Sequence, residues 1–107
     1  MEKYTPDNWV VLKITHGRKE PLYKVLAGWS GGYTQGDTWR MNSGITLVKE
    51  KPDGWYEFRG LSGSCYRCHK DHYRISMAIG PTYSKLKENF GDSVELLPKD
   101  TDWSNLI

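Results

Sequence analysis

Residues 8–27 read NWVVLKITHGRKEPLYKVLA, and they predict two antiparallel strands joined by a short turn. Residues 8–16 alternate loosely between apolar and polar side chains and are rich in β-branched residues, which is typical of a strand. Gly17 and Pro21 bracket a polar turn, because both residues interrupt regular structure. Residues 22–27 then form the second strand. The chain therefore begins as a β-protein.

Further β-structure is expected downstream of this pair. Residues 39–48 predict a third strand, with a bulge near Ser43-Gly44. Pro52-Asp53-Gly54 predicts a hairpin turn, because Asp-Gly tolerates the positive φ that a tight turn needs. Residues 55–59 are its return strand. The remaining candidates are residues 64–69, residues 94–97 and, as either strand or loop, residues 73–79.

One helix is expected between Gly80-Pro81 and Gly91. Within it Tyr83, Leu86 and Phe90 fall on one stripe, which we expect to pack on the sheet. The apolar end of the tail, residues 100–107, fits docking on its own domain or on a neighbouring subunit. Together these elements predict a single domain, residues 1–107, of the α+β class: a small, mostly antiparallel β-sheet domain with one C-terminal helix.

The composition fits a folded domain without a strong charge. The chain has 107 residues, 26% of them charged, and five Trp and seven Tyr, which argues against disorder. The net charge of +2 is too small to indicate nucleic-acid binding. Residues 59–74 nevertheless carry four basic side chains and one acidic one, whereas residues 85–102 are acidic. A basic middle fits an anionic ligand, and two solvated faces fit the pattern equally.

The N-terminus is polar, and no apolar run approaches the length of a membrane span. We therefore expect a cytosolic protein with no membrane partner, in which Cys65 and Cys68 are reduced thiols.

Two similar glycine-serine turns are the principal candidates for a site. GWSGGYTQGDTWR at residues 28–40 and GLSGSCY at residues 60–66 share the pattern G-x-S-G. Side by side they would provide glycine N–H groups, aromatic faces for stacking and Arg side chains for phosphate. Core aromatics and solvated arginines are the competing interpretation. The predicted ligand-binding residues are Trp29, Ser30, Gly31, Gly32, Tyr33, Trp39, Arg40, Arg59, Ser62, Gly63, Ser64 and Tyr66.

Catalysis is not predicted. Residues 28–32 match the G-x-S-x-G nucleophile elbow, but no helical pattern follows Ser30 and the chain is too short for that fold. The three histidines and the scattered carboxylates show no acid–base arrangement. No catalytic residue is therefore assigned.

Cys65-Tyr66-Arg67-Cys68-His69 matches C-x-x-C-H, the attachment motif for c-type haem. Without an export signal, haem is disfavoured. Zinc held by Cys65, Cys68, His69 and His72 is the alternative, but a strand would place the two cysteines on opposite faces. We therefore predict no cofactor and ordinary buried thiols.

The stretch LAGWSGGYTQGDTWRMNSGIT, followed by YEFRGLSGSCYRC, resembles a family of small proteins encoded by tailed bacteriophages. The likeness spans residues 22–74 and depends on Trp29, Gly31-Gly32-Tyr33, Trp39, Ser43-Gly44, Ser62-Gly63-Ser64 and Tyr66. It implies an accessory protein in the host cytoplasm that counters host defence. Such proteins bind an effector protein or sequester a nucleotide signal in the pockets of a homo-oligomer.

The leading hypothesis is a non-enzymatic protein that sequesters a small anionic, nucleotide-derived signal between the two turns. The alternative is an inhibitor that binds a host defence protein directly through an aromatic surface. Nucleic acid is a less favoured partner, because the total charge is nearly neutral.

Overall fold

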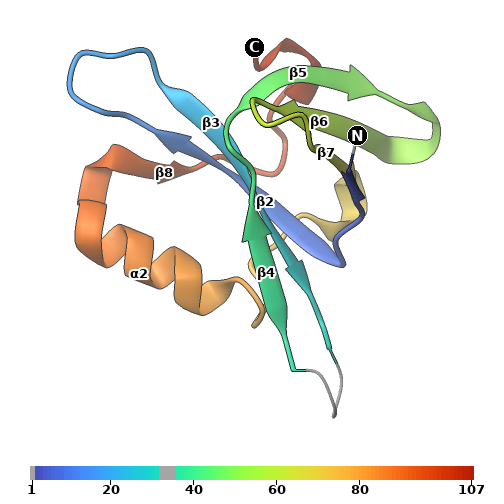
Figure 1. Ribbon diagram of the computed structural model, residues 1–107, viewed down its shortest axis with the longest axis horizontal. Coiled ribbons are helices and arrows are strands. Elements are labelled where there is room, and N and C mark those ends of the chain that lie inside the picture. Colours follow the sequence, from blue (N-terminus) through green and yellow to red (C-terminus); the bar gives the residue numbers. More distant parts are fainter. Residues whose placement is uncertain (1, 32–35) are drawn as a thin grey trace.

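The computed structural model describes residues 2–31 and 36–107 (Figure 1). The strands are β1 (Lys3–Tyr4), β2 (Asn8–Ile14), β3 (Leu22–Trp29), β4 (Thr38–Met41), β5 (Ile45–Glu50), β6 (Trp55–Gly60), β7 (Cys65–His69) and β8 (Val94–Leu96). The helix α2 spans Gly80–Phe90. Short 3-10 turns lie at Pro52–Gly54, Lys70–His72, Gly91–Ser93 and Trp103–Asn105.

In this part of the chain the strands form two four-stranded sheets. The first sheet has the order β1-β7-β6-β5 and the second the order β4-β3-β2-β8. All neighbouring strands are antiparallel except β1 and β7, which are parallel. The domain is therefore α+β with mostly antiparallel sheets and one α-helix among the described residues, as the sequence predicts.

The β2–β3 pair at the start of the chain is confirmed, with Asn8 opposite Gly28 and Ile14 opposite Leu22. The hairpin at residues 52–54 is also confirmed, since β5 and β6 pair antiparallel around it. Asp53 and Gly54 there have φ values of 64° and 87°, the left-handed conformation that Asp-Gly tolerates.

Residues 39–48 do not form the single strand that the sequence predicts. The chain leaves the second sheet after Met41 and enters the first at Ile45. Asn42 marks the exit, because its side-chain oxygen accepts a hydrogen bond from the Val25 N–H at 2.9 Å. Gly44, with φ of 137°, makes the turn that redirects the chain. The irregularity in pairing lies between Ile45 and Leu47, within β5.

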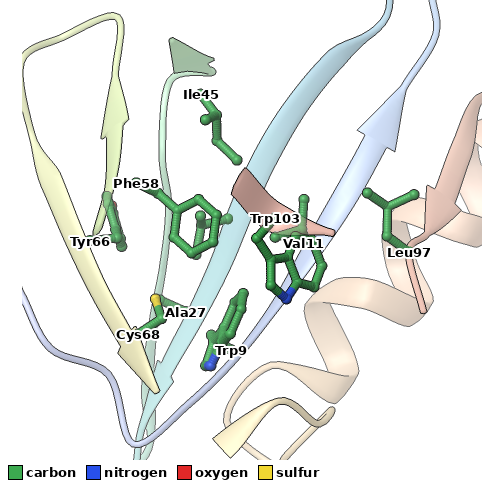
Figure 2. Packing of buried hydrophobic residues seen from close by; sticks show 10 residues of the cluster. Trp9, Val11, Ala27, Ile45, Phe58, Tyr66, Cys68, Leu97 and Trp103 are labelled. Carbon is green, nitrogen blue, oxygen red and sulfur yellow. The ribbon is translucent and has the colours of Figure 1, made fainter. Parts of the chain in front are cut away.

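Both faces of the second sheet are covered by buried hydrophobic residues. One face packs against the first sheet, and Figure 2 shows Trp9, Phe58 and Trp103 at its centre. The other face packs under α2 through Val10, Leu12, Leu26, Ala78, Ile79 and Val94. Figure 1 accordingly shows α2 on the side of the second sheet that faces away from β5–β7.

The C-terminal half differs from expectation in two details. Tyr83 and Leu86 pack on the sheet as predicted, but Phe90 is 53% exposed. Phe90 lies on the correct face of α2, yet it borders an incompletely filled apolar hollow with Ile14 and Leu22. The tail docks on its own domain, because Trp103 is buried and Leu106 packs beside it. Residues 73–79 form a loop with one bridge, between Trp9 and Tyr73.

Candidate functional site

A hollow of about 540 Å³ lies where the N-terminal segment meets the β3–β4 hairpin. We call it the Arg40 hollow, and its lining residues are Lys3, Tyr4, Thr5, Trp29, Thr38, Trp39 and Arg40. Its volume falls in the range of small-molecule sites. The hollow lies at a corner of the two-sheet sandwich, because β1 and β4 are each the outermost strand of their sheet.

Strand register explains why Arg40 and Trp29 meet in this hollow. β3 and β4 pair with Trp29 opposite Thr38 and Ala27 opposite Arg40. Residues directly opposite each other in an antiparallel pair share a face, so Arg40 extends from the face that turns toward the first sheet. Trp39 alternates to the other face, opposite Gly28, and reaches the hollow only because β4 is an edge strand.

Packed aromatic rings form the wall of the Arg40 hollow around Tyr4. The Tyr4 ring packs edge-on against Trp29, with centroids 6.3 Å apart, and lies 5.1 Å from the Tyr66 ring. The Arg40 guanidinium carbon lies over the Tyr4 ring at 4.7 Å from its centroid. The Trp29 indole N–H donates to the Thr5 carbonyl at 3.0 Å. These contacts hold the aromatic faces and the guanidinium in a fixed relation.

The hollow is positively charged at its rim. Lys3 and Arg40 are exposed, and among the described residues neither forms an ion pair with a carboxylate. The Glu2 carboxylate accepts a hydrogen bond from the Tyr4 hydroxyl, which raises the pKa of Tyr4. Burial raises the pKa of Tyr4 further, whereas Arg40 lowers it. Arg40 and Lys3 thus keep hydrogen-bond donors free for an anionic ligand.

The hollow brings together only part of the predicted set. Trp29, Trp39 and Arg40 line it, and Tyr66 lies beneath Tyr4 with 3% of its surface exposed. Ser30 and Gly31 use their backbone N–H groups within the protein, on the Asp7 and Asp37 carboxylates at 2.8 and 3.4 Å. Gly32 and Tyr33 lie outside the described residues.

The second turn lies elsewhere. The Ser62 N–H donates to the Ser43 hydroxyl at 2.9 Å, and the Leu61 N–H donates to the Gly44 carbonyl at 3.0 Å. Ser62, Gly63 and Ser64 therefore pack beside the C-terminal end of β4, whereas Trp29 pairs with its first residue, Thr38. The four residues of β4 span about 13 Å. The described parts of the two turns are thus separated, not adjacent (Figure 1).

Arg59 is also absent from the lining of the Arg40 hollow. It lies in β6 opposite Leu47 and Cys65, in the first sheet. Its Nε atom is buried and has no hydrogen-bond partner among the described residues. The structure therefore does not place Arg59 with Arg40.

Gly28 owes its identity to packing and not to a ligand. A Cβ atom at this position would lie 2.8 Å from Ile79 Cγ2 and 2.9 Å from Ala78 Cβ. The missing side chain lets the segment before α2 approach the second sheet closely. The first glycine of the G-x-S-G pattern is thus a structural residue.

The C-x-x-C-H segment is strand β7, and its two cysteines lie on opposite faces as predicted for a strand. Cys68 belongs to the core between the sheets, whereas Cys65 lies on the other face, and both are buried. Burial raises the pKa of each thiol, that of Cys68 strongly. Low-reactivity thiols are the result. Within residues 2–31 and 36–107, no three His, Cys, Asp or Glu side chains are grouped to hold a metal ion.

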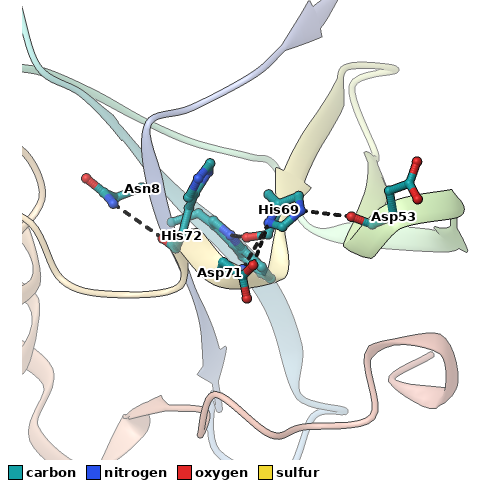
Figure 3. Close-up of polar contacts among 6 residues, drawn as sticks. Asn8, Asp53, His69, Asp71 and His72 are labelled. Carbon is teal, nitrogen blue, oxygen red and sulfur yellow. Dashed lines mark hydrogen bonds and ion pairs between the residues drawn. The ribbon is translucent and has the colours of Figure 1, made fainter.

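His69 has a structural partner on each side of its ring (Figure 3). Its Nε2 lies 2.8 Å from the Asp53 carbonyl, and its Nδ1 accepts a hydrogen bond from the Asp71 N–H at 3.1 Å. His69 therefore connects the β5–β6 turn to the 3-10 turn after β7. The His72 carbonyl accepts a weak contact from the Asn8 amide at 3.5 Å.

Sequence reasoning missed Lys3, Tyr4, Thr5 and Thr38. The first three reach the hollow because β1 pairs with β7, with Lys3 opposite Cys65 and Tyr4 opposite Tyr66. A two-residue strand has no periodicity to detect, so no signal in the sequence marked this segment. For Thr38 the only signal in the sequence was its position next to Trp39.

No family model matches the chain, and comparison with curated proteins and with solved structures finds no match either. In the described part of the chain, no helix is long and apolar enough to cross a membrane.

Proposed function

We propose that this protein is a non-enzymatic binding protein for a small anionic, nucleotide-derived ligand, and that the Arg40 hollow is its site. The observation that carries the proposal is the Arg40 guanidinium over the Tyr4 ring, with two tryptophans and Lys3 on the same hollow. Aromatic faces suit a nucleobase, and Arg and Lys suit its phosphates.

The residues divide this work by position. Trp39 is 48% exposed and offers a ring face for stacking. Arg40 and Lys3 would meet phosphate oxygens from opposite sides of the hollow, since they come from β4 and β1. Trp29 and Tyr4 would wall the ligand and hold Arg40 in place. Ser30, Arg59, Ser62, Gly63 and Ser64 have no part in this narrower proposal.

The resemblance to small bacteriophage proteins supports a biological setting for such binding. A phage accessory protein in the host cytoplasm that binds a nucleotide signal would remove it from the host defence that produced it. Sequestration of this kind needs affinity but no catalysis, which agrees with a hollow of aromatic and basic residues. A homo-oligomer of this protein would carry one such hollow in each subunit.

Isothermal titration with a panel of cyclic nucleotides and ADP-ribose derivatives tests the proposal. We expect one of them to bind, and Arg40→Ala to weaken its binding by about tenfold or more, because a charge-assisted contact is lost. Arg18→Ala is the matched control, since Arg18 is an exposed arginine in the turn between β2 and β3. Absence of binding across the panel would refute the proposal.

A second candidate function comes from another hollow that Trp39 also lines, beside α2. Trp39 also lines a hollow of about 440 Å³ with Pro81 and Leu86 of α2, and Met77 nearby in the chain is 86% exposed. We propose as the alternative that this aromatic and apolar surface binds a host defence protein directly. A stoichiometric partner recovered from host lysate equally by the native protein and by Arg40→Ala, together with no nucleotide binding, would favour this function.

A further inference from the structure

A second hollow, of about 480 Å³, lies on the outer face of the first sheet. We call it the Arg67 hollow, and its principal residues are Lys51, Asp53, Trp55, Glu57 and Arg67. Trp55, Glu57 and Arg67 share this face because side chains point alternately to the two faces of the sheet along β6 and β7. No motif in the sequence marks this face, since Trp55 and Arg67 are twelve residues apart.

The Arg67 hollow repeats the central arrangement of the Arg40 hollow. The Arg67 guanidinium carbon lies over the Trp55 ring at 4.5 Å, as Arg40 lies over Tyr4 at 4.7 Å. The Trp55 ring is held in turn by an edge contact with His69, with centroids 4.9 Å apart. Each hollow thus combines an ordered aromatic ring with an exposed guanidinium.

The two hollows meet at β1. Lys3 and Thr5 line both of them, whereas Tyr4 between them turns inward and packs on the core between the sheets. β1 is the edge strand of the first sheet, so only the width of one strand, about 5 Å, separates the hollows. One extended ligand can therefore occupy both and pass Lys3 on the way.

The charge along this path favours a polyanion. The described residues that line the two hollows include four basic side chains and two carboxylates. The basic residues are Lys3, Arg40, Lys51 and Arg67, and the acidic residues are Asp53 and Glu57. Glu57 is only 8% exposed and lies 4.0 Å from Lys51, so its charge is partly neutralised. The linings of the two hollows together thus carry more positive than negative charge, and the excess comes from Arg40 and from Lys3 on β1.

We infer that the ligand is a short oligonucleotide of at least two nucleotides, linear or cyclic, with one base in each hollow and a phosphate beside Lys3. This inference rests on the proposed function, and it extends the site by Trp55 and Arg67. A single mononucleotide would occupy only one of the two hollows.

Titration of the full chain with AMP, the linear dinucleotide ApA and cyclic di-AMP tests the inference. We expect ApA or cyclic di-AMP to bind roughly tenfold more tightly than AMP, the gain from one additional stacked base. Which of the two binds better identifies the linear or the cyclic form. Arg67→Ala should remove this gain, so that the dinucleotide binds this variant no more tightly than AMP does, and it should reduce the salt dependence of dinucleotide binding.

The controls separate this inference from the proposal on which it rests. Arg67 is exposed, so Arg67→Ala should keep the native circular dichroism spectrum, and Arg18→Ala should change no affinity. Equal binding of AMP and both dinucleotides, insensitive to Arg67→Ala, would overturn the inference and leave the Arg40 hollow as a mononucleotide site. No binding of any of the three would overturn the inference, and the proposed function is then decided by the wider panel.

Discussion

Tyr73 shows how one side chain can join three segments of this fold. Its hydroxyl donates to the Leu97 carbonyl at 2.6 Å and accepts from the Val11 N–H at 3.1 Å. Its ring meets Trp9 edge-on with centroids 4.7 Å apart. The residue thus ties the loop before α2 to β2 and to the chain after β8.

Tyr73→Phe should lower the free energy of unfolding by about 1–3 kcal/mol, because it leaves two buried backbone groups without their partner. The matched control is Tyr23→Phe, since Tyr23 packs on the same core, and no side-chain hydrogen bond among the described residues involves its hydroxyl. Urea unfolding of the three proteins at neutral pH measures the difference. Equal losses in both variants would show that the hydroxyl of Tyr73 contributes nothing specific.

The same hydroxyl has a pH signature. Burial raises the pKa of Tyr73 from 10.0 to about 12, and the hydrogen bond from Val11 opposes this change. A raised pKa means that the protonated hydroxyl stabilises the fold below pH 10 and that this contribution disappears as the pH rises from 10 toward 12. The stability difference between the native protein and Tyr73→Phe should therefore shrink over that interval. A difference independent of pH would contradict the assignment.

At the scale of elements, Gly28 sets the distance between β3 and the segment that leads into α2. Gly28→Ala should destabilise the protein by about 1–3 kcal/mol, because the new methyl group would overlap Ile79 and Ala78. Gly80→Ala is the control, since a Cβ there would meet only Ile75 Cγ2, at an ordinary 3.6 Å. Thermal unfolding followed by circular dichroism compares them. A Gly28→Ala variant as stable as Gly80→Ala would show that the loop before α2 adjusts freely.

The elements themselves follow largely from the sequence. Residues 8–27 carry enough alternation and turn chemistry to specify β2, β3 and their pairing, although β3 continues beyond its predicted end to Trp29. Gly80-Pro81 and Gly91 bracket α2 closely. The division of residues 38–50 into β4 and β5 was not predictable, because its cause is tertiary. Asn42 bonds to Val25 and Ser43 to Ser62, and neither contact leaves a local pattern.

The candidate site was predictable only where its residues are close in the sequence. Trp29, Trp39 and Arg40 belong to one hairpin, so their proximity follows from local sequence. Lys3 and Tyr4 join them only through the parallel pairing of β1 with β7, some sixty residues away. The second G-x-S-G turn resembled the first in sequence, but its hydrogen bonds direct it to residues 43 and 44. Similarity of motif did not imply proximity.

At the scale of the whole molecule, the C-terminal tail closes the space between the two sheets. Trp103 is 3% exposed, and its ring centroid lies 5.4 Å from Trp9 and 6.1 Å from Phe58 (Figure 2). The Tyr73 ring centroid lies 5.3 Å from it. It therefore contacts both sheets and the loop before α2. The Ser104 hydroxyl adds a hydrogen bond to the Glu50 carboxylate of β5 at 2.9 Å.

Trp103→Ala should consequently cost about 3–5 kcal/mol, the loss expected for a large aromatic side chain in a packed core. A domain of this size has about 5–15 kcal/mol of stability in total, so the variant should unfold at a much lower urea concentration. Ile107→Ala is the control, because Ile107 is 61% exposed. If Trp103→Ala unfolds at the same urea concentration as Ile107→Ala, the two sheets hold together without the tail. If it unfolds early as expected, then the Arg40 hollow, formed by one edge of each sheet, depends on a residue that lies in neither sheet.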